Sequence, residues 1–382
     1  MIDENRHRPV NSLRESKDAA IAPLVSVVMS VFNGGEFLQS AIDSVLEQTF
    51  GDFEFIIFDD GSWDGSSNVL ARAAARDQRI VLERLEHKGL THALNRGLRD
   101  AQGEFIARMD ADDISLPDRL EKQVRFLRSH RDIALVGSAF DLIDENSRSL
   151  KIIQYPLAPE DIEPELAQRC VICHPSIMAR LEIMRELGGY RPQYLNGEDY
   201  DLWLRLIERH RLANLPDVLL RHRQHTKKIS VTGYPQQMIS TLVARQAAIC
   251  RRIDGRDPTD TMKSLSLGTF SALGMPNAEI GAFCGHWVRS LFSLALDGRL
   301  PLRRVAHLWL DQGWRVRLPD QEVAHIVASL LWVGYSQREQ MPKAALLLAL
   351  TAVFYPLQVA GRVSGACYRV VRGLPGRQTH GH

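Results

Sequence analysis

The amino-acid sequence predicts an α/β protein with a mostly parallel sheet, followed by a mainly helical C-terminal region. From residue 25 to about residue 143, short apolar runs rich in β-branched and aromatic residues alternate with runs of helical periodicity. Strands and helices in alternation form right-handed βαβ units, and the strands of such units lie parallel. After about residue 235 the strand pattern stops and long helical runs, broken by Gly and Pro, take its place.

Each predicted element has its own local signal. The first strand, residues 25–31, ends at Asn-Gly-Gly, and the second, residues 53–58, ends at Asp-Asp-Gly. A proline in the first turn opens the helix predicted at 117–127. The other predicted strands are 80–82 and 104–109, a further apolar run covers 133–143, and the other helices are predicted at 37–46, around 69–73, and at 90–98, 236–252, 278–296, 322–333 and 343–371.

The chain is expected to form more than one unit, because its 382 residues exceed what a single hydrophobic core usually organises. Residues 1–22 are polar and carry charges of both signs, which predicts a disordered extension rather than a signal peptide. We assign residues 23–240 to the α/β domain and residues 241–382 to the helical region.

Charge and cysteine content narrow the class of protein. A formal net charge of +1 argues against nucleic acid as a partner, since that would require a basic excess. Five cysteines do not make a disulfide framework in a chain of this length, so we expect a reducing, cytoplasmic location. The segment Cys170–His174 matches the CxxCH haem-attachment pattern but lies in an apolar run, so buried structural thiols are expected instead.

Polar side chains follow three of the predicted strands, at the point where each strand ends. Asn33 follows the first strand, Asp59 and Asp60 end the second, and residues 110–113 (DADD) follow the strand 104–109. An open parallel sheet binds its ligands outside the carboxyl ends of its strands. These clusters are therefore expected to converge on one site.

The DADD segment is a candidate metal site. Asp110 and Asp112 are separated by one residue on an extended segment, so both carboxylates can face the same side. Oxygen ligands of this kind suit Mg²⁺ or Mn²⁺ shared with a phosphate group. A helix N-cap remains an alternative for this cluster, as a simple turn does for Asp59-Asp60. A calcium loop is excluded because its sixth position would be Ser115 where a glycine is needed.

A third acidic pair, Glu198-Asp199, precedes an apolar helical run. One of these carboxylates could act as a general base for a hydroxyl nucleophile. The alternative is that one of them caps the helix that follows, and the spacing of the residues does not exclude it.

Taken together and in order, these segments resemble glycosyltransferase family 2, the inverting transferases with the Rossmann-like GT-A fold. The resemblance runs from Val25 to about Ser230. It is carried by "VSVVMSVFNGGEFLQSAIDSVLEQTF", "FEFIIFDDGSWDGS", "HKGLTHALNRGL", "FIARMDADDISLPDRL", "HPSIMAR" and "GEDYDLWLRL", and by the later "RHRQHTKKIS".

The resemblance implies a role for each matching residue. It implies that Asp60 accepts a hydrogen bond from uracil, that Asp110 lies at the ribose or in the metal shell, that Asp112 is the main ligand of Mg²⁺ or Mn²⁺, and that Asp199, beside Glu198, is the catalytic base. His225 and Arg223 are implied at the diphosphate, His225 also as a metal ligand. Asn33, Asp59 and Asn95 are implied on the nucleotide side. His222 stands where an aromatic residue is common in the family, which weakens the match of the segment around Arg223.

The resemblance therefore implies metal-assisted transfer of a sugar from a nucleotide-sugar, with UDP as the expected nucleotide, to a saccharide or lipid-linked acceptor. Surface polysaccharide or glycolipid biosynthesis is the expected context. One rival is a sugar-phosphate nucleotidyltransferase, but the loop after the first strand, residues 32–36, lacks the basic residue that such enzymes use. The other is a non-catalytic nucleotide-sugar-binding protein, against which the full acidic set weighs.

The C-terminal segment suggests a membrane surface as a further partner. Residues 344–361 carry no charge, basic residues flank them, and no acidic residue follows Glu339. An apolar stretch with a basic surround suits the inner face of a membrane with anionic lipids. A pair of buried helices packed on the catalytic domain is the alternative.

Overall fold

The computed structural model describes residues 22–225, 234–266, 268–297 and, near the C-terminus, residues 343, 344, 347 and 351. The chain divides into two compact units, and the division falls between His225 and Thr226. The sequence-based boundary was placed later, after residue 240.

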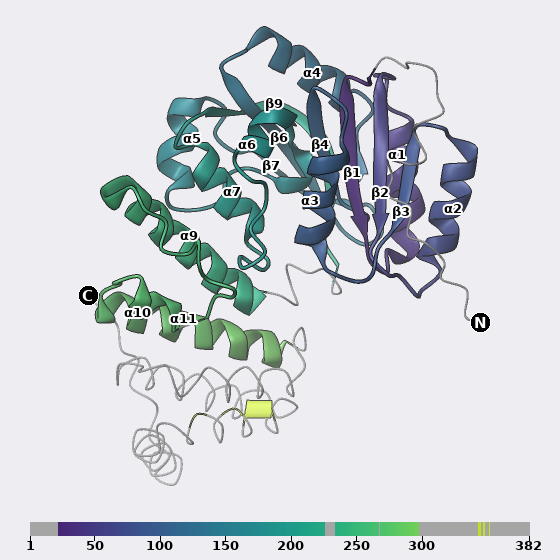
Figure 1. The fold of residues 1–382 in the computed structure, drawn as a ribbon. Coiled ribbons are helices and arrows are strands. Elements are labelled where there is room, and N and C mark those ends of the chain that lie inside the picture. The colour runs from purple at the N-terminus through teal and green to yellow at the C-terminus, as the bar shows by residue number, and fades with distance from the viewer. Residues whose placement is uncertain are drawn as a thin grey trace, which may run out of the picture. The chain divides into compact units, whose positions relative to one another are not determined.

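The first unit is built on one sheet, which has nine strands among the described residues, in the order β3-β2-β1-β4-β8-β6-β9-β5, with β7 paired to β6 (Figure 1). The strands are β1 Val25–Val31, β2 Phe53–Asp59, β3 Ile80–Arg84, β4 Phe105–Met109, β5 Ile114–Ser115, β6 Ile133–Ile143, β7 Ser149–Ile153, β8 Met178–Arg180 and β9 Arg211–Arg223.

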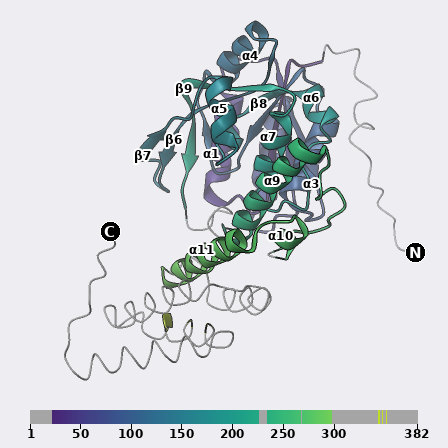
Figure 2. The ribbon, with the colours of Figure 1, turned by 90° about the vertical axis from the view of Figure 1, so that its left-hand side faces the viewer.

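Helices cover both faces of this sheet. They are α1 Leu38–Leu46, α2 Ser66–Arg76, α3 Leu90–Asp100, α4 Arg119–Ser129, α5 Pro159–Leu166, α6 Leu181–Glu186 and α7 Glu198–Leu206, with short 3₁₀ turns η2 Gly35–Phe37 and η3 His174–Ser176. Figures 1 and 2 show α1 and α3 on opposite sides of β1. Because α1 and α3 lie on opposite faces, the chain reverses its direction of winding between β1 and β4.

That reversal decides where a ligand can bind. Strands β3, β2, β1 and β4 pair in parallel, and the side chains of β2, β1 and β4 are nearly all buried because helices lie on both faces. A crevice opens outside the carboxyl ends of such strands where the strand order reverses. Here the reversal point lies between the ends of β1 and β4.

The predicted α/β class with a mostly parallel sheet is confirmed, and the structure adds strands that the sequence pattern did not predict. Strand β8 runs antiparallel between β4 and β6, and β9 lies parallel to β6 along most of its length. Strands β4, β6 and β9 therefore end at the same edge of the sheet. Helix α4 begins at Arg119, two residues after the predicted start, because the carbonyl of Pro117 accepts a hydrogen bond from the Thr49 amide.

The second unit is helical where the structure describes it, as predicted. Helix α9 covers Tyr234–Asp254, α10 covers Thr269–Ala272 and α11 covers Asn277–Leu296. Within the described residues, no helix has the length and apolar character needed to cross a bilayer. The helices predicted at 322–333 and 343–371, and the proposed membrane segment, lie almost entirely outside the described residues.

Candidate functional site

The loops after β1 and β2 are tied together by hydrogen bonds. The amide of Asn33 donates to Ser62 Oγ (3.0 Å), and Asn33 Oδ1 accepts from the amide of Trp63 (2.9 Å). Asn33 has a left-handed backbone (φ 52°), a conformation that asparagine adopts more readily than most residues. The amide of Gly34 donates to Ser66 Oγ (2.9 Å) at the start of α2. Asn33 thus fixes one wall of the site.

Asp59 and Asp60 are buried, and both carboxylates accept hydrogen bonds from the surrounding backbone. Asp59 accepts from the amide of Ser62 (2.9 Å) and from Ser67 Oγ. Asp60 accepts from the amides of Lys88 and Gly89, both at 2.9 Å, and its Oδ2 lies 3.1 Å from His87 Nδ1. Asp60 therefore holds the loop after β3 against the end of β2.

An aromatic cluster lies beside Asp60, and the sequence analysis did not single it out. The ring of His87 stacks on Phe32 with centroids 3.8 Å apart, and Trp63 meets Phe32 edge-on at 4.9 Å. Trp63 is 76% exposed and Phe32 is 38% exposed. These rings offer a flat apolar surface at the ends of β1 and β2, which is suited to a planar ligand.

The three aspartates of the DADD segment form a cluster at the end of β4. Asp110, Asp112 and Asp113 each offer an oxygen, and these oxygens lie within 4.8 Å of one another. Asp113 is fully buried and accepts from the amide of Arg223 (2.9 Å) and from His222 Nδ1 (3.0 Å), so it holds the end of β9. The side chains of Asp110 and Asp112 are 26% and 19% exposed. These two are the aspartates that can reach a ligand.

The donor set fits a hard divalent cation, since carboxylate oxygens are the ligands that Mg²⁺ and Mn²⁺ prefer. His225 Nε2 lies 2.8 Å from Asp112 Oδ2, so the predicted histidine is next to the predicted main ligand. Arg223 is buried, and its guanidinium donates to carbonyls of Asp112, Asp144 and Glu145 and stacks on Phe37. Arg223 therefore fixes the backbone of the aspartate cluster.

The third acidic pair begins helix α7. The N-cap residue of this helix is Gly197, and in the first turn the carboxylate of Asp199 accepts a hydrogen bond from the amide of Tyr200 (2.7 Å). Asp199 therefore also satisfies a backbone donor at the helix terminus. Glu198 is buried, whereas the side chain of Asp199 is 24% exposed. Burial, and then the charge of Asp199, raise the pKa of Glu198 to about 7. Burial also raises the pKa of Asp199. The pair is thus a basic carboxylate system facing partly exposed space.

The segment that leads into α7 is fixed by a buried ion-pair cluster. Asp201, fully buried one turn into the helix, accepts from the guanidinium groups of Arg191 and Arg205. Arg205 also donates to the carbonyls of Leu187 and Gly189, both at 2.7 Å. A buried ion pair of this kind fixes geometry more reliably than it adds stability. Its effect here is to hold the start of α7 and the loop before it in one arrangement.

Asn95, on α3, binds the same loop from the other side. Its side chain donates to the carbonyl of Tyr190 (2.7 Å) and accepts from the amide of Tyr190 (2.8 Å). The hydroxyl of Tyr190 lies 2.9 Å from His174 Nε2, and His174 Nδ1 lies 3.9 Å from Asp199 Oδ2. Burial lowers the pKa of His174 well below its usual value, so this histidine is neutral. Asn95 therefore acts on the geometry behind Asp199.

The CxxCH segment is not assembled as a metal or haem site within the part of the chain that the structure describes. His174 is engaged with Tyr190, and Cys170 Sγ approaches the carbonyl of Ile172 at 3.4 Å. Burial raises the pKa of the Cys170 thiol well above its usual value, so the thiol stays protonated. This agrees with the expectation of structural thiols.

The predicted site residues fall into three groups at one edge of the sheet. Asn33, Asp59 and Asp60 are joined through the loops after β1 and β2. The aspartate cluster is joined to Arg223 and His225 at the end of β9, and Phe37 in η2 contacts both (ring centroids 5.4 Å from His225). The Glu198-Asp199 pair lies within electrostatic reach of Asp110, since the charge of Asp110 raises the pKa of both residues.

Comparison with known proteins identifies the family. The family model "Glycosyl transferase family 2" matches residues 26–188. The O-antigen biosynthesis glycosyltransferase WbnJ of Escherichia coli is 36% identical over 211 residues, which are 54% of this chain and 82% of WbnJ. The amylovoran biosynthesis glycosyltransferase AmsE of Erwinia amylovora is 34% identical over 204 residues, 52% of this chain and 76% of AmsE.

Among solved structures, the S. aureus TarS 1–349 complex with UDP-GlcNAc aligns with 92% of this chain and 93% of its own, with a TM-score of 0.48 and 15% identity. That similarity is too low to assign a ligand. The sequence relatives are closer and cover most of their own length. The chain belongs to glycosyltransferase family 2, and it is an enzyme of that family.

Proposed function

We propose that this protein is an inverting glycosyltransferase that moves a sugar from a nucleotide-sugar, with UDP as the nucleotide, to a hydroxyl group of a saccharide or lipid-linked acceptor. The observation that carries the proposal is the arrangement of two acidic systems at one sheet edge. One is an oxygen-ligand cluster suited to a cation and a diphosphate. The other is a carboxylate pair whose pKa values are raised. Donor activation and proton removal need these two systems.

On the nucleotide side, the proposal assigns Asn33, Asp59 and Asp60 to the wall that holds the base. A carboxylate offers about four acceptor positions, and three donors approach that of Asp60, so one position remains for the N3–H of uracil. The exposed rings of Phe32 and Trp63 next to it would bury the faces of a planar base. Asn95 would act on the nucleotide side through the loop that it holds.

At the diphosphate, Asp110 and Asp112 would hold a divalent cation, with His225 beside Asp112. The cation would neutralise the charge that develops on the leaving diphosphate. Arg223 would serve this group by fixing the carbonyl of Asp112, to which its Nε donates at 2.9 Å. In this assignment the chain positions the leaving group before any bond breaks.

The transfer itself is a displacement at the anomeric carbon. The acceptor oxygen attacks that carbon as its proton passes to the carboxylate of Asp199, and the bond from carbon to the diphosphate oxygen breaks with its electron pair leaving on the nucleoside diphosphate. The anomeric configuration is inverted because attack and departure occur on opposite faces. Glu198, whose pKa is about 7, would hold its proton below neutral pH, and in that state Asp199 would be the ionised partner of the pair.

The biosynthetic context follows from the named relatives. WbnJ is named for O-antigen biosynthesis and AmsE for amylovoran biosynthesis, so we propose a surface polysaccharide or glycolipid as the product. A lipid-linked acceptor would make the cytoplasmic face of a membrane the working location, with the basic and apolar C-terminal segment, residues 344–361 and their flanks, as the anchor. The two rival functions, a sugar-phosphate nucleotidyltransferase and a non-catalytic binding protein, are not favoured, because the relatives that define the family are named as glycosyltransferases.

The test is a binding and turnover experiment with nucleotides as the probes. The melting temperature of the full chain would be measured with UDP and with GDP, each in Mn²⁺ and in EDTA. We expect UDP with Mn²⁺ to raise it most. Asp112→Ala should abolish the effect of Mn²⁺ and the release of UDP from UDP-sugars, whereas Asp118→Ala, at a partly exposed aspartate that pairs with Lys122, should behave as the wild type. Equal UDP binding in EDTA and Mn²⁺ would contradict the metal assignment, and a preference for GDP would contradict the nucleotide.

A further inference from the structure

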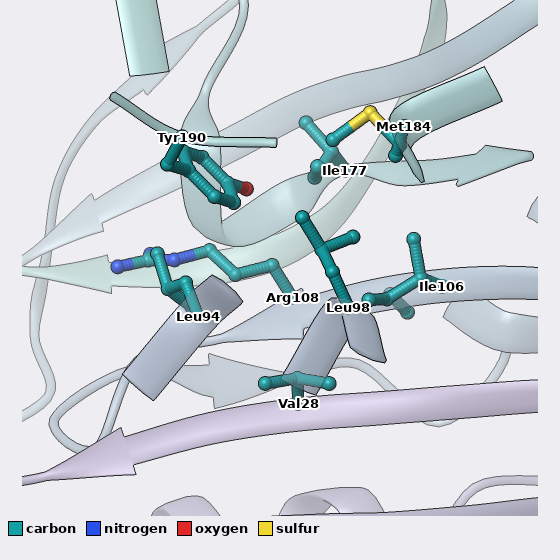
Figure 3. A pocket seen from close by; sticks show the side chains of 9 residues that line it. Val28, Leu94, Leu98, Ile106, Arg108, Ile177, Met184 and Tyr190 are labelled. Carbon is teal, nitrogen blue, oxygen red and sulfur yellow. The ribbon is translucent and has the colours of Figure 1, made fainter. Parts of the chain in front are cut away.

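Arg108 is a buried cation that the assignments above leave without a role. It lies on β4, and its side chain is 7% exposed. Figure 3 shows its guanidinium between the ring of Tyr190 and Leu94 of α3, beside a small cavity of about 10 Å³ that is otherwise lined mainly by apolar side chains. A charge in such surroundings is costly unless several partners compensate it.

The hydrogen bonds of Arg108 only partly compensate its burial. Its Nη2 lies 2.5 Å from Asp110 Oδ1. Its Nε and Nη1 are buried and have no hydrogen-bond partner among the described residues. Burial opposes the charge, but the carboxylate of Asp110 and the other acidic groups nearby outweigh it and raise the pKa of Arg108. Arg108 is therefore a permanent cation, and its single ion pair does not by itself explain why this charge is buried.

A line of contacts leads from Arg108 to the catalytic pair. Tyr190, which covers Arg108 in Figure 3, places its hydroxyl 2.9 Å from His174 Nε2, and His174 Nδ1 lies 3.9 Å from Asp199 Oδ2. His174 is neutral, so it cannot balance the charge of Asp199. The positive charge on this side of the pair comes from Arg108.

We infer that Arg108 is a positioning residue that serves both halves of the reaction, holding Asp110 by an ion pair and keeping Asp199 ionised by its fixed charge. The inference rests on the proposed function, since it assumes that Asp199 accepts the proton. In its electrostatic effect, Arg108 lowers the pKa of both Glu198 and Asp199, whereas Asp110 raises both. Arg108 thus offsets the repulsion that the metal-side carboxylate exerts on the base.

Among the described residues, the other ionisable groups that face Asp199 do not supply this effect. They lie on several elements: Glu198 beside it on α7, Asp110 after β4, His174 in η3, Tyr190 before α7, and Cys170 and Tyr155 in the segments before η3. Each of these is acidic or neutral. Removing Arg108 should therefore make the base harder to ionise, and the defect should depend on pH.

The experiment compares pH profiles of kcat/KM for the wild type, Arg108→Met and Arg108→Lys, with a donor that the wild type uses. We expect the acidic limb of Arg108→Met to move to higher pH by about one unit or more, as for loss of a nearby opposite charge. Activity should recover toward the wild-type value at high pH, and Arg108→Lys should keep the limb near its wild-type position. Arg180→Met is the control, because Arg180 is a mostly buried arginine on the neighbouring strand β8 that donates to the carbonyls of Ile133 and Leu127 and to no residue of the site.

If Arg108→Met does not fold, Arg108→Gln, which removes the charge but keeps a polar end, replaces it, and its acidic limb should move in the same direction. A loss of activity that is equal at every pH in the variant that folds would overturn the inference.

A readout without turnover separates this inference from the proposed function. Between pH 5.5 and pH 8, the melting temperature of metal-free Arg108→Met should fall more steeply with pH than that of the wild type, because proton binding is linked to stability. The sign follows because carboxyl groups with raised pKa values lose their stabilising proton as pH rises. If the wild type transfers no sugar from any donor but this slope difference is found, the proposed function fails and the electrostatic role stands. Equal slopes would overturn the role of Arg108 even in an active enzyme.

Discussion

The adjacent carboxylates Asp59-Asp60, at the end of β2, and Glu198-Asp199, at the start of α7, have different surroundings. Asp59 and Asp60 accept hydrogen bonds from three backbone amides, a serine hydroxyl and a histidine ring. Glu198 is buried and the side chain of Asp199 is 24% exposed. Among the described residues, the carboxylate of Asp199 accepts from the amide of Tyr200 and from its own amide, and that of Glu198 accepts from its own amide. The first pair is held by donors from several loops, whereas the donors of the second pair are amides of its own helix turn and leave its pKa values raised. Raised carboxyl pKa values are typical of a reactive pair.

The largest effect is expected at the reactive pair. Asp199→Asn keeps the size of the side chain but cannot accept the acceptor's proton, so kcat should fall by about 10²–10⁴-fold. Affinity for the nucleotide should stay unchanged, because Asp199 is assigned to the acceptor side. Steady-state kinetics with a UDP-sugar would measure both. Asp217→Asn, at a partly exposed aspartate on β9 that pairs with Lys122, is the control. Near-normal turnover in Asp199→Asn would show that Asp199 is not the base and serves only the N-terminus of α7.

A smaller effect is expected on stability, and here the loss should be larger at Asp59 than at Asp199. Asp59→Ala leaves the amide of Ser62 and the hydroxyl of Ser67 without their acceptor, so the free energy of unfolding should fall by about 2–3 kcal/mol. Asp199→Ala removes a carboxylate that few donors compensate, and it should cost much less. Urea denaturation of both variants gives the comparison. An equal loss in both would show that the two pairs are not different in kind.

The smallest effect concerns Glu198 and pH. Its folded-state pKa of about 7 is above the ordinary value of 4.5, so the folded protein keeps a proton that the unfolded chain has lost between these values. Stability from this group is complete below pH 4.5 and is lost as pH rises through 7. Glu198→Gln should therefore be more stable than the wild type at pH 8, by about 1–2 kcal/mol since Asp199 shares the shift, and should differ little at pH 4.

Thermal unfolding at the two pH values checks this prediction, with Glu186→Gln on the exposed side of α6 as the matched control, which should change unfolding at neither pH. A Glu198→Gln variant that is less stable than the wild type at pH 8 would contradict the raised pKa of Glu198, because the ionised carboxylate would then stabilise the fold.

The parallel half of the fold could be predicted because its strands are short apolar runs between helices of regular period. Strand β9 was missed for a physical reason. It contains Pro216, which is unfavourable inside a sheet, and its register against β6 shifts where Ser138 pairs with Leu215 and Ala139 with Val218. The irregularity accommodates the proline and hides the strand from any pattern of period two. Strand β8 has three residues, too few for a pattern.

The clustering of the acidic residues could be expected as well, because carboxylates at strand ends are visible in the sequence, whereas their roles stay predictions. Their surroundings could not be expected. Asn95 and Tyr190 are joined by hydrogen bonds although they are 95 positions apart in the chain, and no local sequence pattern predicts such a contact. Arg108 reads as an ordinary residue of a strand until burial and Asp110 are known. Arg223 was expected at the diphosphate from the resemblance, and that role stays a prediction, with its contacts to the carbonyls around Asp112 and Asp144 now added.

The contrast between the two carboxylate pairs can be measured directly by titration. Glutamate carboxyl carbons would be labelled with ¹³C in the metal-free full chain, and their NMR signals followed against pH in the wild type and in Glu198→Gln. The account predicts one signal that titrates near pH 7 and is missing from the variant, because burial and Asp199 raise the pKa of Glu198 to that value. A missing signal that titrates near 4.5, together with the exposed glutamates, would contradict the account, since Glu198 would then be as well compensated as Asp59 and Asp60.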